Sequence, residues 1–315
     1  MKFRTEIQLT RESCTINHDS RVLLLGSCFA TNIGERLLHH KFNVLSNPFG
    51  VLFNPISIMN AVEFVSGNKQ ITSNELDFND GLWHSFYHHG SFSNTDLNSC
   101  VDTINKTTAH THKFLKDATH AIITLGTAHV WRHIEKDIVV SNCHKFPNSI
   151  FSHYLLSIDD VVSSLETIHA RLKSGNPSLQ IVFTVSPVRY LNKGMHANQL
   201  SKATLLLAIE RLQQKYKGLI YFPSYEIMMD DLRDYRFFDE DLVHPSQTAI
   251  EYIWEAFSTT FFDEITRTLN NRIAKVHSAI NHELLHPESE SSVKFKKWLL
   301  SEMEQLKIDL PHVVF

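Results

Sequence analysis

The sequence has little of what marks a membrane or secreted protein. No apolar run in its 315 residues is long enough to cross a bilayer. Residues 1–14 lack the apolar core of a secretory signal. The four cysteines are scattered and form no C-x-x-C pair, which argues against a disulfide framework. We therefore expect a cytoplasmic protein with reduced thiols and no membrane partner.

The sequence also lacks a large excess of positive or negative residues. The formal net charge is only -4, so nothing in the charge balance favours binding to nucleic acid. Twenty histidines invite a metal-binding interpretation, but none stands in an H-E-x-x-H motif or beside a Cys/His quartet with zinc spacing. The sequence thus predicts no nucleic-acid partner, no metal site and no cofactor, and it contains nothing that specifies an oligomeric state.

What the chain does contain is an alternation of buried strands and amphipathic helices. Hydrophobic residues make up 43% of the sequence, enough for a sizeable core. Strands are predicted at 3–9, 22–25, 42–45, 120–125, 129–134, 137–140, 179–185 and 219–222. Most are followed by helical patterns, which is typical of an α/β fold: a three-layer sandwich with a central, mostly parallel sheet. We assign residues 1–265 to this domain and residues 266–315 to a helical C-terminal extension.

The segment RVLLLGSCFA, residues 21–30, reads as a buried strand, a tight turn and the start of a helix. Because ligands bind at the carboxyl ends of parallel strands, Ser27 and Cys28 are predicted to lie at the edge of a crevice. The first N–H groups of a helix have no intrahelical partner, and they favour a thiolate or an oxyanion. Cys28 is therefore a candidate nucleophile, although a serine cap and a small buried thiol would give the same pattern.

A second informative stretch is Asp241-Leu242-Val243-His244-Pro245, just before a strongly amphipathic helix. Pro245 favours an extended conformation at His244 and presets the first turn of the helix. Asp241 is close enough in sequence to accept the Nδ1 proton of His244, which leaves Nε2 as a base. An exposed turn aspartate and a structural histidine would explain the same residues.

Three further positions are candidates for contact with a substrate. Gly50 lies in a loop rich in asparagine and proline, where its backbone can approach a ligand. His84 belongs to the aromatic and histidine-rich segment 82–92, which could line a pocket or simply pack beneath a loop. Arg189 follows a predicted strand and could meet a carboxylate or phosphate, or pair with a carboxylate of the protein.

Together these motifs resemble the GSCFA family, which is similar to the SGNH (GDSL-like) hydrolases. The resemblance rests on GSCFA at 26–30, NPFG at 47–50, LGT at 125–127, SNCHKFP at 141–147, SPVR at 186–189 and DLVHPS at 241–246. It implies an acyl-enzyme site with Asp241 and His244 near the end of the domain. Matching Gly26 to the glycine of Gly-Asp-Ser puts Cys28 at the position of the nucleophile.

The same resemblance implies an oxyanion hole made of the nucleophile's own N–H, a loop glycine and an asparagine. Gly50 fits the glycine, whereas the asparagine of the usual G-x-N-D motif is absent after Gly126. Thr127, Asn54 and Asn142 are the candidates to replace it.

Two functions follow from these residues. One is an esterase, thioesterase or acyltransferase that acts on a small acyl or carbohydrate substrate through Cys28, His244 and Asp241, with Ser27 as the alternate nucleophile. The other is a non-catalytic protein of the same fold that binds an acylated or carbohydrate ligand through residues 83–92 and Arg189.

Overall fold

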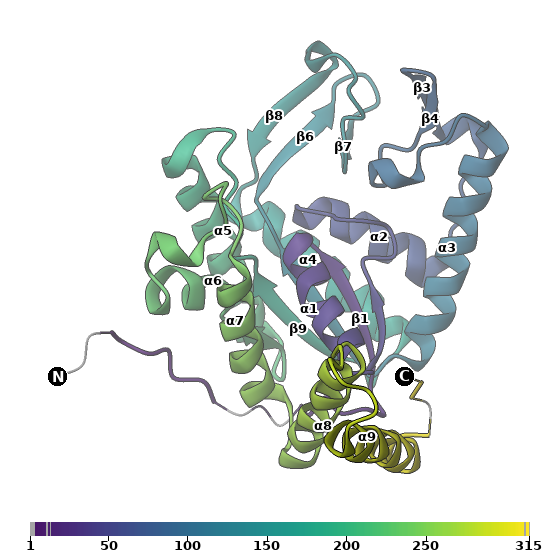
Figure 1. The fold of residues 1–315 in the computed structure, drawn as a ribbon. Coiled ribbons are helices and arrows are strands. Elements are labelled where there is room, and N and C mark those ends of the chain that lie inside the picture. The colour runs from purple at the N-terminus through teal and green to yellow at the C-terminus, as the bar shows by residue number, and fades with distance from the viewer. Residues whose placement is uncertain (1–3, 11, 13, 312, 315) are drawn as a thin grey trace.

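Five parallel strands form the centre of the molecule (Figure 1). In the computed structural model, which describes residues 4–10, 12, 14–311, 313 and 314, their order is β10-β9-β5-β1-β2. They span the following residues: β1, Arg21–Gly26; β2, Asn43–Ser46; β5, His120–Leu125; β9, Gln180–Val185; β10, Ile220–Phe222. The chain leaves β1 toward one side of the sheet for β2 and later returns to its other side for β5. The carboxyl ends of β1 and β5 thus lie at the switch point where an open α/β sheet binds ligands.

Alternating residues of the strands face two separate cores. Leu23 and Leu25 of β1 pack with four helices on one face: α2 (Pro55–Gly67), α3 (Leu97–Asp117), α4 (Ile158–Gly175) and α5 (Gly194–Lys215). Val22 and Leu24 pack on the opposite face with α1 (Cys28–His39) and α7 (Gln247–Phe261). This period of two is what a strand buried on both faces requires. The predicted three-layer α/β fold is confirmed.

Smaller elements lie above the main sheet in Figure 1. A three-stranded antiparallel sheet contains β6 (His129–His133), β7 (Ile138–Val140) and β8 (Phe151–Leu155). A short hairpin pairs β3 (Asp77–Asn79) with β4 (Leu82–His84). The sequence predicts the β6–β7 hairpin but not β8, whose alternate residues are exposed and polar and give a weak apolar signal.

The remaining short elements are helical turns. They span the following residues: η1, Ser73–Glu75; η2, Gly90–Phe92; η3, Asn148–Ile150; α6, Ser224–Glu226; η4, Ile227–Asp231; η5, Tyr235–Phe237.

The strand predicted at 3–9 is wrong for residues 4–9, which form no strand, and Phe3 lies outside the described residues. Ile7 packs against the core on the α1 and α7 face, but these residues pair with no strand of the described chain. An apolar pattern is therefore not enough to predict a strand here. The backbone of residues 4–9 also needs hydrogen bonds to a neighbouring strand, and it makes none with the described strands.

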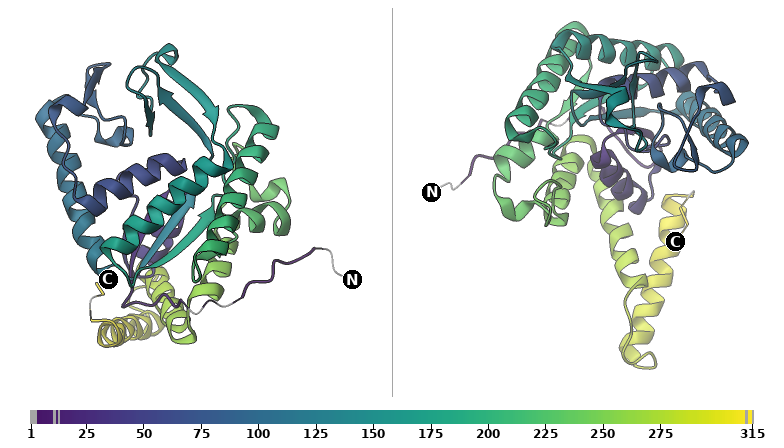
Figure 2. Two further views of the ribbon diagram at one scale, coloured as in Figure 1. Left: turned by 180° about the vertical axis from the view of Figure 1, so that it is seen from behind. Right: turned by 90° about the horizontal axis from the view of Figure 1, so that it is seen from above.

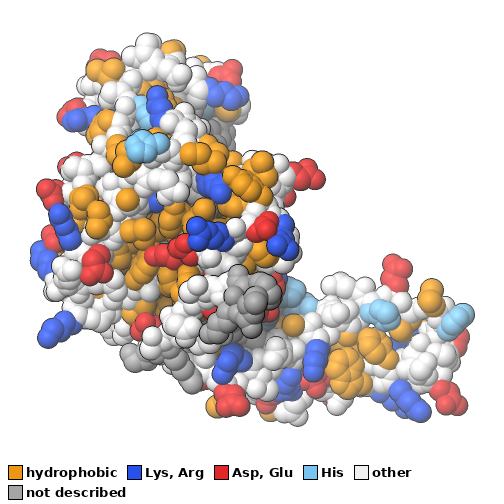
Figure 3. All heavy atoms as spheres, turned by 90° about the vertical axis from the view of Figure 1, so that its left-hand side faces the viewer, with side chains coloured by type: hydrophobic (Ala, Val, Ile, Leu, Met, Phe, Trp, Pro, Cys, Tyr) orange, Lys and Arg blue, Asp and Glu red, His pale blue; other side chains and the backbone are white. Residues whose placement is uncertain are grey.

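Two C-terminal helices, α8 (Glu264–Ile280) and α9 (Glu290–Asp309), form an antiparallel hairpin that projects from the body (Figures 2 and 3). It has a small core of its own, which includes Ile273, Val276 and Leu306. The domain boundary at residue 265 stays a prediction. No helix in the described part of the chain is long and apolar enough to cross a membrane.

Candidate active site

The turn after β1 is held in one conformation by its neighbours. Gly26 has φ +139°, and a Cβ there would lie 2.1 Å from the carbonyl oxygen of Thr124, so only glycine fits. The Gly26 amide donates to Oδ1 of Asn47 at 2.8 Å, and the Ser27 amide donates to Thr124 O at 3.0 Å. Ser27 is extended, and α1 begins at Cys28. The predicted strand, turn and helix start are confirmed.

Cys28 is partly exposed at the N-terminus of α1. Burial raises the pKa of its thiol above the usual value, and the charge of Asp241 raises it further. The amides of Cys28 and Phe29 and the charge of Lys202 act in the opposite direction. Because the net shift is upward, the thiol is the resting form at neutral pH, and nucleophilic attack requires a base.

Asp241 and His244 form a hydrogen-bonded pair in the loop before α7. His244 Nδ1 and Asp241 Oδ2 are 2.6 Å apart. Asp241 Oδ1 also accepts from the amides of Val243, at 2.8 Å, and His244, at 2.9 Å. These bonds lower the pKa of Asp241 to about 2, so its carboxylate is charged at neutral pH. The imidazole is half exposed, with Nδ1 committed to Asp241.

The two halves of the site are close enough to interact electrostatically. The charge of Asp241 is close enough to Cys28 to raise the pKa of its thiol. No hydrogen bond between Cys28 and His244 is present among the described residues. Catalytic hydrogen bonds are often long in a free enzyme and shorten when substrate binds.

Arg189 holds the loop that carries His244. Its backbone amide donates to Val243 O, and its Nη1 donates to Leu242 O, both at 3.2 Å. Its guanidinium lies 3.8 Å from the ring centroid of Phe238, which precedes the same loop. The predicted pairing with a protein carboxylate is not found among the described residues, where Arg189 contacts backbone carbonyls and an aromatic ring. Contact of Arg189 with a substrate stays a prediction.

Gly50 lies in a turn that occupies its amide. The Gly50 N–H donates to Asn47 O at 2.8 Å, and φ is +76°. A Cβ at this position would lie 2.3 Å from Cβ of His89. Glycine is required at position 50 because another group packs closely against its backbone, as predicted. That group is the side chain of His89, however, and not a ligand in an open cleft.

Two of the candidate replacement donors serve the fold. Asn54 caps α2, where its Oδ1 accepts from the amide of Ser57 and its Nδ2 donates to the hydroxyl of Ser57, both at 2.9 Å. Thr127 Oγ1 lies 2.9 Å from Oγ of Ser201. Both side chains are buried, so neither is a free donor at a solvent-accessible site.

Asn142 and His84 are also engaged elsewhere. Asn142 Oδ1 accepts from the amide of His144 at 2.8 Å. His84 is buried, and its Nδ1 and Nε2 lie 2.7 Å from Ser93 Oγ and 3.0 Å from Asn79 O. The buried ring of His84 thus packs beneath a loop, the alternative to a pocket-lining role.

Ser27, the alternate nucleophile, is only 1% exposed. Its hydroxyl has no hydrogen-bond partner within the described structure. A serine nucleophile needs both access to substrate and a base that accepts its proton. Ser27 lacks this access in the present conformation, whereas Cys28 is partly exposed, so exposure favours Cys28.

The GSCFA family model matches residues 21–257, a span that contains both the Cys28 turn and the His244 loop. The chain belongs to the GSCFA family. No curated protein shows a significant match. Among solved structures, the chain is similar to a carbohydrate esterase family 3 protein from Talaromyces cellulolyticus, with 12% identity and a TM-score of 0.37 over 81% of this chain and 99% of that one. It is also similar to a mutant acetyl esterase with an acetate ion, with 12% identity and a TM-score of 0.37 over 82% and 99%.

Sequence reasoning missed two residues of this GSCFA-family site. Asn47 binds the turn from the side: its Nδ2 donates to Oγ1 of Thr31 at 2.9 Å and to Ser27 O at 3.4 Å. Lys202 lies buried in α5 and influences Cys28 electrostatically. A signal for Lys202 was present, because it shares the apolar helical spacing of Leu205 and Ile209.

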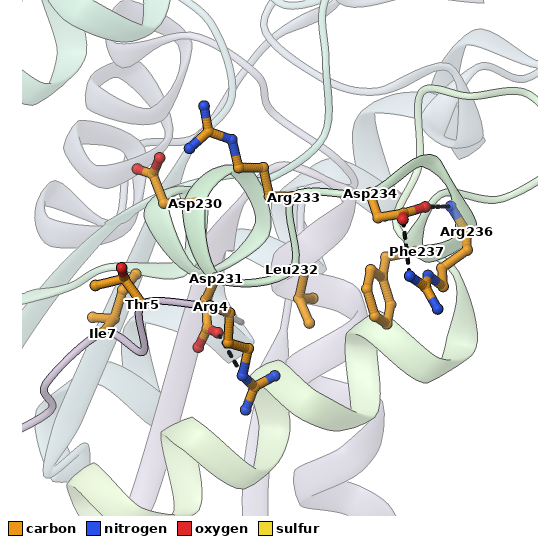
Figure 4. Close-up of a pocket in the computed structure, with 10 residues that line it drawn as sticks. All are labelled: Arg4, Thr5, Ile7, Asp230, Asp231, Leu232, Arg233, Asp234, Arg236 and Phe237. Atoms are coloured by element: carbon orange, nitrogen blue, oxygen red, sulfur yellow. Dashed lines mark hydrogen bonds and ion pairs between the residues drawn. The ribbon is translucent and has the colours of Figure 1, made fainter. Parts of the chain in front are cut away.

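A separate pocket of about 760 Å³ lies beside η4 and η5 (Figure 4). It is lined by Arg4, Thr5 and Ile7 and by residues 230–234, 236 and 237. Figure 4 shows the Arg4–Asp231 and Asp234–Arg236 contacts within it. None of the residues that the sequence predicts for the site lines this pocket. No group of three or more potential metal ligands occurs in the described structure.

Proposed function

We propose that the chain is an SGNH-like hydrolase or acyltransferase that acts on an ester or thioester bond of a small acyl or carbohydrate substrate. Cys28 is the nucleophile, His244 the general base and acid, and Asp241 the residue that orients the imidazole. The nature of the acyl acceptor, water or another molecule, decides between hydrolysis and transfer.

The Asp241–His244 hydrogen bond is the observation that carries this proposal. A carboxylate on Nδ1 fixes one tautomer of the ring, leaves Nε2 able to accept a proton, and stabilises the imidazolium that forms. The amides of Val243 and His244 hold the other carboxylate oxygen, Oδ1, as in an Asx turn, and this keeps Oδ2 directed at the ring. Since the Cys28 thiol is protonated at rest, it requires such a base.

The reaction has two half-steps. His244 Nε2 takes the thiol proton as Sγ of Cys28 attacks the acyl carbonyl carbon, and the carbonyl oxygen gains negative charge near the first N–H groups of α1. His244 returns the proton to the leaving oxygen or sulfur, and an acyl-thioester remains on Cys28. The acceptor then attacks this thioester, gives its proton to His244, and releases the thiol.

A screen of short-chain aryl esters and acyl thioesters tests the proposal, run on the parent and on Cys28→Ala, His244→Ala and Ser27→Ala. We expect turnover in the parent, its loss in the first two variants, and its retention in Ser27→Ala. Retention in both Cys28→Ala and His244→Ala would remove the assignment. Loss in Ser27→Ala alone, with an unchanged melting temperature, would move the nucleophile to Ser27.

A binding protein on the same fold is the second candidate. It is favoured by the internal hydrogen bonds of Gly50 and Asn54, which leave the amides of α1 as the oxyanion donors. Loss of one donor costs roughly a hundredfold or more in rate. Saturable binding of an ester analogue without turnover, unchanged in His244→Ala, would support this candidate.

A further inference from the structure

A lysine is buried directly beneath the candidate site. Lys202 lies in the middle of α5 and is 1% exposed. Its Nζ donates to Gly126 O and to Ser186 O, both at 2.7 Å. These carbonyls follow the last residues of β5 and β9, so the amino group lies under the edge of the sheet where ligands are expected.

This lysine has no ionic partner among the described residues: neither of its hydrogen-bond acceptors is a carboxylate. Buried charges in proteins are normally paired, because removing an ammonium group from water without compensation is costly. Burial accordingly lowers the pKa of Lys202 to about 7, and the one ionisable group that opposes this shift is Cys28. The ring of Tyr225, whose centroid is 5.5 Å from Nζ, also favours the cation.

The link between Lys202 and the nucleophile turn is short. Lys202 binds the carbonyl of Gly126, and a Cβ built on Gly126 would lie only 3.3 Å from Cβ of Ser27. The residue after Ser27 is Cys28, whose thiol pKa Lys202 lowers. The cation thus lies behind the turn, on the side of the sheet away from α1.

We propose that Lys202 is a positioning residue whose buried ammonium group favours the thiolate form of Cys28. It acts through the sulfur and does not touch substrate. The groups that face Cys28 then have opposite effects: Asp241, from the His244 loop, disfavours the thiolate, while Lys202, from α5, and the amides of α1 favour it. That this thiolate is used in acyl transfer rests on the proposed function, but the electrostatic coupling itself does not.

Alkylation of Cys28 by iodoacetamide measures the coupling without any substrate. The rate is followed from pH 5 to 10 by mass spectrometry of the Cys28 peptide, in the parent and in Lys202→Gln. Glutamine keeps an N–H₂ group for the two carbonyls but carries no charge. We expect the alkylation rate to be several-fold lower in Lys202→Gln than in the parent at pH 7 and below, where Lys202 of the parent carries its charge, and the two rates to converge above pH 9, where that charge is lost.

Lys193→Gln is the matched control, because it removes an exposed lysine next to the same helix and changes the net charge equally. Its profile should coincide with that of the parent. An unchanged alkylation rate between pH 6 and 7 in a folded Lys202→Gln protein would overturn the proposal and leave Lys202 as a donor to two carbonyls only.

A second measurement needs no substitution of Lys202. Coupling between two sites is reciprocal, so if Lys202 favours the thiolate, the thiolate must favour the ammonium form. In protein labelled with ¹³C at the lysine ε-carbon, one signal should titrate near pH 7 in Cys28→Ala and at higher pH in Cys28→Asp, whose carboxylate supplies at neutral pH the negative charge of the thiolate. Identical titrations in the two variants would contradict the proposal. Absence of esterase activity would remove the proposed function and leave both titrations valid.

Discussion

Two histidine environments in this chain differ in a way that separates catalysis from packing. His244 is half exposed, and its Nδ1 is bound to a carboxylate. His84 is 5% exposed, and both of its ring nitrogens lie within hydrogen-bond distance of atoms that hold a loop. A histidine can exchange protons with a substrate only if one nitrogen is both accessible and uncommitted. Histidine content alone therefore says little about function here.

The largest expected effect on activity comes from comparing two separate variants, in which either His244 or His84 is replaced by glutamine. His244→Gln should lower kcat for an ester substrate by at least about 10⁴-fold with an unchanged melting temperature, because it removes the base. His84→Gln should keep activity but lower the free energy of unfolding by about 1–3 kcal/mol, because buried hydrogen bonds are lost. Equal losses of activity in the two folded variants would end the distinction.

Asp241→Asn sharpens the role of the carboxylate. The amide oxygen of the new side chain can still accept from the amides of Val243 and His244, so the loop should keep its shape. The side-chain NH₂ cannot accept the Nδ1 proton, and the wrong tautomer of His244 is favoured. We expect kcat to fall about 10²- to 10⁴-fold. A fall of less than about threefold, measured with the same ester, would show that Asp241 only shapes the loop.

Arg189→Ala tests whether the His244 loop needs its anchor. The variant removes the Nη1 bond to Leu242 O and the contact with Phe238. We expect kcat to fall about 10- to 100-fold, because small displacements of a base are costly. Arg236→Ala is the control, since it removes an exposed arginine near the same loop whose partner is Asp234. Equal effects of the two substitutions would mean that the Arg189 contacts do not position His244.

The smallest expected effect is a pH dependence of the melting temperature that arises from the buried histidines. Burial lowers the pKa of His40, His120 and His144 to about 4 and that of His88 to about 3. Unfolding returns them to about 6.5, so the unfolded chain binds more protons and stability falls as the pH decreases from about 6.5 to 4. The melting temperature should fall over this window. A flat profile would contradict the assigned burial.

His144→Gln should flatten that pH dependence, because one proton-binding site is lost from the unfolded chain. Scanning calorimetry of the parent and of His144→Gln at several pH values makes the comparison.

The local parts of the site could be predicted from the sequence. The apolar run of β1, the glycine at its end and the helical spacing of α1 can be read within a few consecutive residues. The Asp241–His244 bond spans three positions of one loop, and Pro245 limits its geometry. Short-range constraints of this kind need no knowledge of the rest of the fold.

The long-range parts could not be predicted. Whether the amide of Gly50 is free depends on a turn closed by Asn47, and the role of Asn54 depends on where α2 begins. Lys202 follows Cys28 at a great distance in sequence and reaches it only through packing of α5 against the sheet. Such relations arise from tertiary contacts, which periodicity does not contain.

The most direct test of the central claim is capture of the acyl-enzyme. The parent is mixed with an activated acyl ester, quenched in acid, digested and analysed by tandem mass spectrometry. The account predicts one acyl group on Cys28, removed by neutral hydroxylamine as a thioester is, and none in Cys28→Ala. Turnover of the ester with no adduct on Cys28, or with the adduct on another residue, would contradict it.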